Sequence, residues 1–533
     1  MESFIPEHRR KKAANHQAEL RSLEFALLCE ELGQPQQQFH SIHVAGSKGK
    51  GQTASYIAHG LAALNLRVGL FSSPHLHSYS ERIQVLQQKR PSLVEEGGLR
   101  REVETLDIST ILEQEGRKLR QDFSYFHWVS AGFREQDEGP EKVYLQPNFF
   151  AVLTLLAFRS FAAASCDWVV LETGIGGRLC PTNVVTPELS VITPIELEHT
   201  DILGERLELV AAEKAAIIKA GRPCVSARQY PEVEAVLRAH AAQKESPLYF
   251  LPQCLKSFHT EEISVPYPVN SVNGQLWQTF LRPRRLCFEI VLEEKARHSE
   301  LFLRAYSSTQ ADNLALALLG LQVWEEGRGG PQFLGGQGCY LNGCYLNGLR
   351  VHAEEEGREA PAKAHWDALL RGLESSRVAG RFSLYCLDGV LLLVDGAHTP
   401  VSCARLMEDM QGYLDDWQRI FPSSGKKLKL SLLFAAVQGK NFTEMARILA
   451  PKFDEILLTR AGTFKENNLA ALEQAFSLSL RGEGTILARI EEPAQALEKL
   501  LENSPDLLVI CGSFYLLGEL LPLLNRYDQP YGF

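Results

Sequence analysis

The feature that most restricts the fold of this chain is a glycine-rich turn between an apolar run and a helix-like stretch. Residues 41–45 form the apolar run, and residues 53–64 carry apolar side chains at helical spacing. The turn between them holds Gly46, Gly49 and Gly51. Backbone N–H groups at a helix N-terminus attract anions, and glycine lets the chain turn tightly around them. The order strand, turn, helix therefore predicts a phosphate site.

Lys50 adds a cation that can reach the outer phosphates of a nucleotide. The strict pattern G-x-x-x-x-G-K-[ST] is not met, because Val44 stands at its first glycine and Gly51 at its hydroxyl residue. A surface turn with solvated lysines is the alternative interpretation of the same residues. The strand-like run before the turn and the helix-like stretch after it favour a nucleotide site.

Strand-like and helix-like segments alternate along most of the chain, which is typical of parallel sheets wrapped by helices. A length of 533 residues exceeds what one core usually supports. We predict an α/β protein, with a P-loop-type doubly wound parallel sheet domain over residues 1–375. A smaller Rossmann-like α/β domain is predicted over residues 376–533. Residues 245–308 have more β-type alternation, and residues 326–362 read as a flexible, solvent-exposed insertion.

Composition narrows the function classes. The net charge of -10 argues against broad binding to nucleic acid or anionic membranes, but leaves room for a local basic pocket. The 11 cysteines show no C-x-x-C pair, which favours free thiols in a reducing compartment. The apolar stretch 507–524 contains Gly512, Ser513 and Glu519, so we interpret it as a buried strand and a helix. We expect a cytoplasmic, monomeric protein without a membrane or nucleic-acid partner.

Seven sequence blocks, in order, resemble those of folylpolyglutamate synthases and dihydrofolate synthases, which belong to the Mur ligase superfamily. The first is H-V-A-G-S-K-G-K-G-Q-T, and later ones include S-S-P-H-L, E-T-G-I-G-G-R-L, E-H-T-D-I-L-G and D-G-A-H-T-P. The blocks lie at residues 43–53, 70–83, 171–183, 195–204, 213–219, 379–400 and 512–516. Their order across nearly the whole chain makes chance similarity a poor explanation.

The resemblance implies that ATP is bound by the glycine-rich turn, by an asparagine that faces the adenine, and by two residues of the second domain. These are Gly46, Ser47, Lys48, Gly49, Lys50, Gly51, Gln52 and Thr53, then Asn313, Arg381 and Asp395. By residue pattern alone, Asn313 would be an ordinary helix-surface residue. Asp395 ends an apolar strand, where an acid is costly unless it is used.

The resemblance also implies a metal site, because Ser73, Glu172 and His199 match Mg²⁺ ligands of the family. All three follow or end strand-like runs, and such strand ends converge on one crevice of a doubly wound sheet. K⁺ remains open as a further cation. Imidazole is an unusual ligand for Mg²⁺, so position alone would make His199 a loop histidine.

Further roles are carried over in the same way. The resemblance gives Lys50, Lys214 and His398 catalytic roles, with Lys214 carbamylated, although a helix lysine is ordinarily solvated. Folate contacts are implied for Pro74, His75 and Arg82, and glutamate contacts for His398 and Ser513.

The implied function is ATP-dependent ligation of L-glutamate to the γ-carboxylate of a folate, through an acyl phosphate. Dihydropteroate is a second acceptor, but Cys180 and Pro181 depart from the family pattern near the pterin. Gln52 replaces a loop serine, and Thr53 is the residue that could supply the missing hydroxyl. Three alternatives stay open: a catalytically weakened homologue that acts as a binding protein, another Mur-type amide ligase, and a P-loop NTPase switch.

Overall fold

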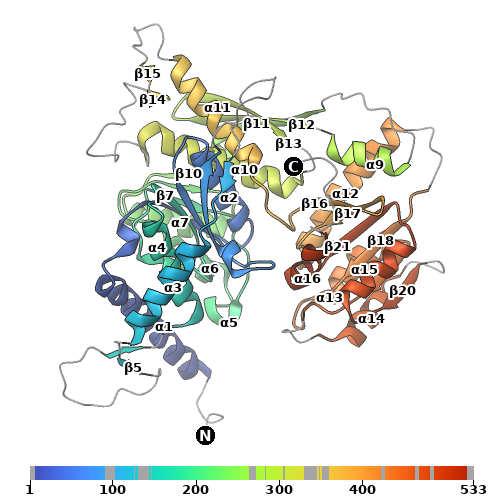
Figure 1. Ribbon diagram of the computed structural model, residues 1–533, viewed down its shortest axis with the longest axis horizontal. Coiled ribbons are helices and arrows are strands. Elements are labelled where there is room, and N and C mark those ends of the chain that lie inside the picture. The colour runs from blue at the N-terminus through green and yellow to red at the C-terminus, as the bar shows by residue number, and fades with distance from the viewer. Residues whose placement is uncertain are drawn as a thin grey trace.

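The computed structural model contains two α/β units that face each other across a cleft (Figure 1). It describes residues 7–89, 103–124, 127–129, 143–145, 147–262, 272–282, 284–303, 306–328, 345–346, 349–350, 359–421, 427–462, 467–480 and 485–524. Most of the predicted insertion at 326–362 lies outside these residues. None of the described helices is long and apolar enough to cross a membrane.

The first unit is built on an eight-stranded sheet with the order β10-β9-β8-β1-β7-β2-β3-β4. The strands from β10 to β2 run parallel, and β3 and β4 are added antiparallel at one edge. Its strands are β1 His40–Ala45, β2 Val68–Phe71, β3 Ile83–Gln88, β4 Val103–Thr105, β7 Trp168–Glu172, β8 Leu189–Ile192, β9 Cys224–Ser226 and β10 Leu248–Phe250.

Helices cover both faces of this sheet. Alternation along β7 shows the two layers: Val170 packs on the α2 and α10 side, and Val169 packs on the α4 side with Phe158. Both faces are buried, so the strands read as continuous apolar runs. The helices are α1 Glu7–Glu31, α2 Lys50–Ala62, α3 Ser109–Ser124, α4 Phe149–Ala163, α5 Thr200–Leu203, α6 Leu207–Ala215, α7 Pro231–Gln243, α8 Leu251–Cys254, α10 Ser308–Val323 and α11 Glu359–Ser375.

A separate antiparallel sheet of three strands, β11-β12-β13, lies beside α10 and α11. It confirms the β-type alternation expected in this stretch. Its strands are β11 Leu255–Glu262, β12 Arg284–Leu292 and β13 Lys295–Leu303. Two small pairs complete this half, β5 His127–Val129 with β6 Val143–Leu145, and β14 Tyr345–Leu346 with β15 Leu349–Arg350.

The second unit has a six-stranded sheet with the order β16-β17-β21-β18-β19-β20, in which only the edge strand β16 runs antiparallel. Its strands are β16 Ser383–Leu387, β17 Val390–Val394, β18 Leu430–Phe434, β19 Glu455–Leu458, β20 Ile486–Arg489 and β21 Leu507–Cys511. Its helices are α12 Pro400–Ile420, α13 Phe442–Leu449, α14 Leu469–Ser477, α15 Pro493–Glu502 and α16 Phe514–Leu524. The predicted α/β class with two sheets is confirmed.

One helix crosses between the units. Helix α9, Val272–Leu281, lies in sequence between β11 and β12, yet Leu276 and Phe280 are buried in the core of the second unit. The Phe280 ring stacks on Tyr413 of α12 with centroids 4.7 Å apart. Figure 1 shows α9 beside α12, away from the helices of the first unit. The domain division at residue 375 stays a prediction, and α9 belongs to the first half in sequence but packs in the core of the second unit.

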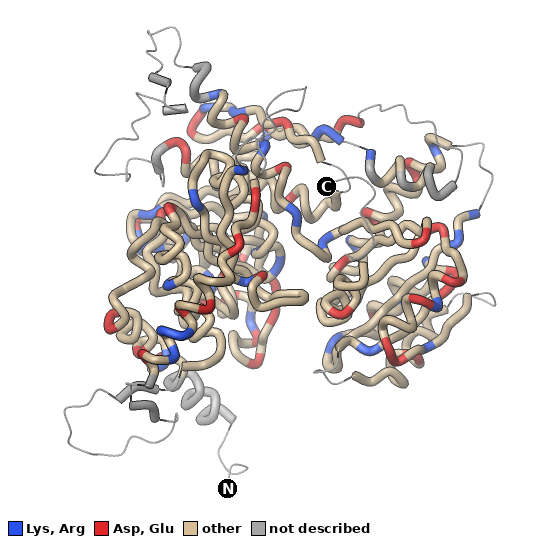
Figure 2. The backbone as a smooth tube through the Cα atoms, in the orientation of Figure 1, with Lys and Arg blue, Asp and Glu red and all other residues tan. Residues whose placement is uncertain are grey.

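Acidic and basic residues are interspersed over both units (Figure 2). The cysteines that the structure describes all carry free thiols, as their unpatterned spacing predicts.

Candidate active site

The cleft between the two units has a volume of about 1210 Å³. That exceeds the ~300–1,000 Å³ typical of a single small-molecule pocket, so more than one substrate can enter. The carboxyl ends of β8, β1, β7 and β2 open into it from one side, because these strands are neighbours in the sheet. Loops that follow β17, β18 and β21 line the other side.

The glycine-rich turn lies between β1 and α2, at the floor of the cleft. Gly46 and Gly49 have φ angles of 148° and 82°, which other residues rarely adopt. A Cβ atom at Gly46 would collide with Thr193, and one at Gly49 would collide with Asn313. The first amides of α2, from Lys50 on, have no acceptor within the helix and face the cleft end of the sheet. The glycine-rich turn thus has the geometry of an anion site, and its role in binding a phosphate chain stays a prediction.

The turn is held from below by buried polar groups. The ammonium of Lys214 on α6, only 1% exposed, donates to the carbonyl oxygen of Gly46 (2.8 Å) and to Glu198 (2.7 Å). The amides of Ser47 and Lys48 donate to the carbonyl oxygen of Pro194. Burial lowers the pKa of Lys214, and the neighbouring Glu198 carboxylate opposes this shift. Lys214 acts on the cleft through the turn, and its carbamylation stays a prediction.

A second buried group of polar side chains joins β1, the strand that leads into the turn, to the segment after β7. The His43 ring bonds to the Thr182 hydroxyl at 2.9 Å, and Cys180 Sγ lies 3.0 Å from that hydroxyl and accepts from the Gly174 amide. Burial lowers the pKa of His43 to about 3, so its ring is neutral at pH 7. The departure at Cys180 thus has a structural role, since the thiol bonds within the segment that follows β7 and holds the amide of Gly174, which lines the cleft.

Glu172 is a carboxylic acid that lies close to the glycine-rich turn. It is 3% exposed at the end of β7, and its Oε2 accepts from the Ser73 amide at 2.8 Å. Burial raises its pKa, and the positive charges of Lys50 and Arg381 oppose the shift. A Cβ on Gly51 would lie 3.1 Å from the same carboxylate oxygen, so glycine permits this close approach.

The residue types fit a hard cation such as Mg²⁺, since Glu172 is a buried carboxylate and Ser73, whose amide bonds to it, carries a hydroxyl group. His199 lines the same cleft from the turn before α5, in a left-handed backbone conformation with φ 47°. Its imidazole nitrogen is the less typical donor of the three.

Asn313 reaches the turn from α10. It is 4% exposed, and its Nδ2 donates to Gln52 Oε1 at 2.8 Å. Gln52 therefore uses its side-chain oxygen to fix Asn313, and it lines the cleft. Thr53 is fully buried and does not line the cleft, so its hydroxyl does not replace the serine that the family pattern has at position 52.

The second unit contributes two opposite charges, those of Asp395 and Arg381. Asp395, directly after β17, accepts from the amides of Phe382 and Ala397, each at 2.8 Å. Burial raises its pKa, and Arg381 is the charge that opposes this most. The guanidinium of Arg381 lies 4.5 Å from the centre of the Phe514 ring, which fixes its plane. Asp395 thus holds the loop that points Arg381 into the cleft.

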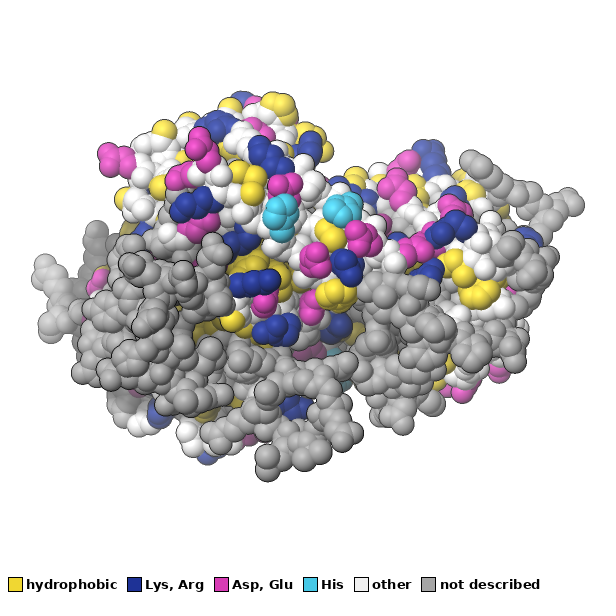
Figure 3. All heavy atoms as spheres, turned by 90° about the horizontal axis from the view of Figure 1, so that it is seen from above, with side chains coloured by type: hydrophobic (Ala, Val, Ile, Leu, Met, Phe, Trp, Pro, Cys, Tyr) yellow, Lys and Arg dark blue, Asp and Glu magenta, His cyan; other side chains and the backbone are white. Residues whose placement is uncertain are grey.

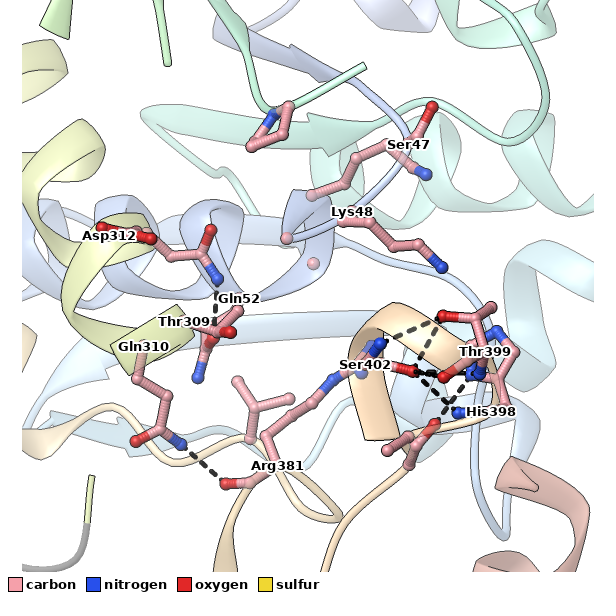
Figure 4. Close-up of a pocket in the computed structure, with 18 of the residues that line it drawn as sticks. Ser47, Lys48, Gln52, Thr309, Gln310, Asp312, Arg381, His398, Thr399 and Ser402 are labelled. Carbon is pink, nitrogen blue, oxygen red and sulfur yellow. Dashed lines mark hydrogen bonds between the residues drawn. The ribbon is translucent and has the colours of Figure 1, made fainter. Parts of the chain in front are cut away.

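His398 follows the same strand. Its Nδ1 lies 2.7 Å from the carbonyl oxygen of Gly396, which can only accept, so Nδ1 carries the proton and Nε2 offers a lone pair. Burial lowers its pKa to about 4. Figure 4 shows Lys48 extending from the first unit toward Thr399, with His398 and Ser402 beside it. Ser513, 3% exposed, also lines the cleft and accepts from the Tyr515 amide at 3.1 Å.

Most of the residues singled out by sequence line this one cleft, including both Lys50 and Asp395. The exceptions are Gly46, Thr53, Arg82 and Lys214. Arg82 lies behind His75, since its Nε donates to His75 Nδ1 at 2.8 Å, and His75 packs on Tyr79 with ring centroids 4.3 Å apart.

Proteins with known names resemble this chain in sequence along most of its length. The dihydrofolate synthase/folylpolyglutamate synthase of Bacillus subtilis is 26% identical over 502 residues, 92% of each chain. The folylpolyglutamate synthase of Lacticaseibacillus casei is 26% identical over 92% of this chain and 91% of its own. Both relatives are similar to this chain along nearly its whole length, and both bear the name of folylpolyglutamate synthase. No protein-family model matches it.

Solved structures of the family share the fold. The crystal structure of folylpolyglutamate synthase from Thermotoga maritima matches with a TM-score of 0.64, at 23% identity, over 95% of this chain and 94% of its own. That of Mycobacterium tuberculosis, complexed with ADP and AMPPCP, matches with a TM-score of 0.63, at 22% identity, over 95% and 96%. At these identities the likeness establishes the fold.

Sequence reasoning missed several residues of the cleft. Gln310 on α10 donates from Nε2 to the carbonyl oxygen of Arg381 at 2.6 Å, which ties the two units together (Figure 4). Lys440, exposed in the turn after β18, lines the cleft and places a positive charge near Lys48 and His398. Its place after a strand of the second sheet is the signal that could have identified it. Phe514 lies in the block at residues 512–516, but no sequence pattern indicates that it packs on Arg381.

Proposed function

We propose that this chain joins L-glutamate to the γ-carboxylate of a folate in a reaction that uses ATP. The observation that carries the proposal is the shared cleft, in which the glycine-rich turn before α2 faces Arg381, Asp395 and His398 of the second unit. Relatives that match along nearly their whole length bear the name of this activity. The residue roles below are part of the proposal.

The first step is phosphoryl transfer. An oxygen of the folate γ-carboxylate forms a bond to the γ-phosphorus of ATP, the bond from that phosphorus to the bridging oxygen breaks, and ADP leaves. Lys50 and the first amides of α2 hold the phosphates and stabilise the charge that develops on the transferred group. Asn313 contacts the adenine side, and Arg381 approaches the phosphates from the second unit. The remaining turn residues, Gly46, Ser47, Lys48, Gly49, Gly51 and Gln52, shape this site.

Mg²⁺, bound by Glu172 and Ser73 with His199, would neutralise phosphate charge and hold the phosphates in line; K⁺ remains an optional second cation. Glu172 is well suited, because burial already disfavours its charge and a cation would restore it. Lys214 keeps the turn in shape from below, through Gly46.

The second step is amide formation. The amine of L-glutamate attacks the acyl carbon, the carbon–oxygen bond to phosphate breaks, and inorganic phosphate carries away one former carboxylate oxygen. His398 Nε2 accepts a hydrogen bond from the amine and orients its lone pair, and the proton that the amine loses passes to the leaving phosphate. Ser513 contacts the same substrate. Lys48 and Lys440 supply positive charge for its carboxylates. The two units exclude water that would hydrolyse the acyl phosphate.

The folate would enter along the loop after β2. Pro74 and His75 line the cleft there, and Arg82 fixes the His75 ring. A dihydropteroate acceptor would use the same loop, with its own carboxylate at the phosphates.

The test is turnover of purified protein with ATP and L-glutamate, with tetrahydrofolate and dihydropteroate supplied in separate reactions. The proposal expects phosphate release that depends on acceptor, and a product that is heavier by one glutamyl residue. Tight ATP and folate binding without any product would instead support the weakened homologue, which Gln52 favours. In that case Gln52→Ser, which restores the hydroxyl, should recover turnover. Phosphate release that is independent of every folate acceptor would overturn the proposal.

A further inference from the structure

The outer face of the β11–β13 sheet carries a cluster of polar ligand groups that is not part of the cleft lining. The inner face packs Leu286, Phe288 and Ile290 into the core against α10. On the opposite face, ligand atoms of His259, Glu261 and Cys287 all lie within 4.8 Å of one another. None of these three residues lines the cleft.

Strand register explains why they meet. His259 and Glu261 are two residues apart on β11, so their side chains share a face of the sheet. Cys287 stands directly opposite His259 on β12 in the antiparallel ladder. Side chains placed opposite each other have Cβ atoms about 4.5–5.5 Å apart, within chelating reach of a single ion. In tetrahedral zinc sites, bond lengths of 2.0–2.3 Å put neighbouring ligand atoms roughly 3.5 Å apart, so small side-chain rotations would close the group.

The types of ligand atom in this cluster indicate which metal ion it would bind. Thiolate, imidazole and carboxylate together are typical ligands of Zn²⁺, whereas Mg²⁺ takes oxygen ligands. We propose that His259, Glu261 and Cys287 form a zinc site on the outer face of the β11–β13 sheet, with a solvent molecule as the fourth ligand. Three protein ligands and one open position match the exposure of this face.

The surroundings of Glu261 support the assignment. Its Oε1 lies 3.6 Å from His259 Nε2, and its Oε2 lies 3.3 Å from the Arg285 guanidinium. One carboxylate oxygen is therefore turned toward the cluster, and the other is held by a neighbour that orients it, as outer groups do around protein metal sites. Glu300 stands opposite Cys287 on β13, and it adds negative charge on the third strand. Figure 3 views the molecule from above, and it shows histidine side chains among acidic and basic ones on this side.

A zinc ion at this site would stabilise the edge strand β11 of the three-stranded sheet. β11 is an outer strand whose residues from Lys256 to Glu262 are all exposed, and one metal ion would tie it to β12. The chain continues from β11 toward α9, which packs on the second unit. A metal at this place would therefore stabilise the start of the connection between the units, without taking part in the chemistry of the cleft.

The experiment uses the full-length protein, dialysed against a chelator and then titrated with Zn²⁺ in competition with a chromophoric chelator. The inference expects one zinc per chain, and at least a tenfold weaker affinity in His259→Ala and in Cys287→Ser. Co²⁺ in place of Zn²⁺ should give a thiolate-to-cobalt charge-transfer absorption in the parent protein, and Cys287→Ser should lose it.

Two matched variants serve as controls. His298→Ala removes a histidine from the same sheet, and Cys386→Ser removes another partly exposed cysteine, on β16. Both should bind as the parent protein does. The inference is overturned if no charge-transfer band develops, if the band survives in Cys287→Ser, or if the controls lose zinc as strongly as the ligand variants. Because ligase activity plays no part in these readouts, they stand apart from the proposed function.

Discussion

The two walls of the cleft are built differently. In the first unit, the glycine-rich turn rests on buried groups of its own unit, since Lys214 bonds to Gly46 and Asn313 bonds to Gln52. In the second unit, Asp395 fixes the loop of Arg381, but a contact from the other unit, Gln310 to the Arg381 carbonyl, sets where that loop lies. The glycine-rich turn is thus held by hydrogen bonds within the first unit alone. The position of the Arg381 loop depends in addition on a hydrogen bond between the two units.

The first wall should be the most sensitive to loss of charge. Lys50 is the cation that most strongly favours the charged form of the buried Glu172 carboxylate. Lys50→Ala removes this positive charge, and the transferred phosphoryl group then loses a cation that stabilises it. We expect kcat/KM for ATP to fall about a thousandfold, as when a transition-state charge partner is removed. Steady-state phosphate release measures it. Lys452→Ala, at an exposed lysine outside the cleft, should leave the rate unchanged, and a loss below tenfold for Lys50→Ala would contradict the assignment.

In the second unit, a substitution should lower activity by displacing the loop that carries Arg381. Asp395→Ala leaves the amides of Phe382 and Ala397 without their acceptor, and it removes the carboxylate that has the largest electrostatic influence on Arg381. Hydrogen bonds to charged groups contribute about 1.5–3 kcal/mol each, so we expect kcat/KM to fall about a hundredfold. Asp395→Asn keeps one acceptor and should lose less. Equal losses in the two variants, measured in the same assay with thermal unfolding as a check on folding, would argue against the hydrogen-bond account.

The buried histidine under the turn gives a pH test of the first wall. The pKa of His43 is about 3 in the folded protein, against about 6.5 when unfolded. Its neutral form is favoured by folding, so the stability it contributes is present above pH 6.5 and is lost as the pH falls toward 3. Between pH 7 and pH 5 we expect a loss of about 2 kcal/mol from this group.

The variant His43→Gln should not show the part of the fall in unfolding free energy between pH 7 and pH 5 that comes from His43. Denaturant unfolding at pH 7 and pH 5 measures the difference, and the exposed His298→Gln is the matched control. If His43→Gln and the parent protein lose the same free energy between these two pH values, the ring is not the buried neutral group described here.

Sequence alone located the first wall well. The glycine-rich turn follows one strand, and Glu172, Ser73 and His199 lie at or after the ends of its neighbours, so the topology of a parallel sheet predicts that they converge. Local patterns also predicted both sheets and the helix–strand alternation. The helix predicted over residues 209–219 ends at Ala215, and Lys214 remains within it.

The second wall and the join between the units could not be predicted in the same way. Gln310, Phe514 and α9 matter through contacts across long sequence separations, which leave no period in the sequence. Thr53 shows the same limit at short range, because one residue along a helix turns a side chain by about 100° and takes its hydroxyl out of the cleft. The zinc cluster likewise depends on the pairing of β11 with β12.

The smallest effect should come from the contact between the walls. Gln310→Ala removes the bond to the Arg381 carbonyl, at a residue that lines the cleft beside the loop of the second unit. A single neutral hydrogen bond contributes about 0.5–1.5 kcal/mol, so we expect a twofold to tenfold rise in KM for glutamate. Gln322→Ala, on the same helix but away from the cleft, is the control. An unchanged KM would mean that the alignment of the second wall does not rest on this bond.

The central claim is that both walls act on one acyl phosphate in the cleft between them. It is tested most directly with a folate substrate whose γ-carboxylate carries ¹⁸O in both positions. The account predicts that each phosphate released with the new amide contains one ¹⁸O atom, because the carboxylate oxygen that attacked ATP leaves with the phosphorus. Product formation with unlabelled phosphate would show that no acyl phosphate forms, and it would contradict the account.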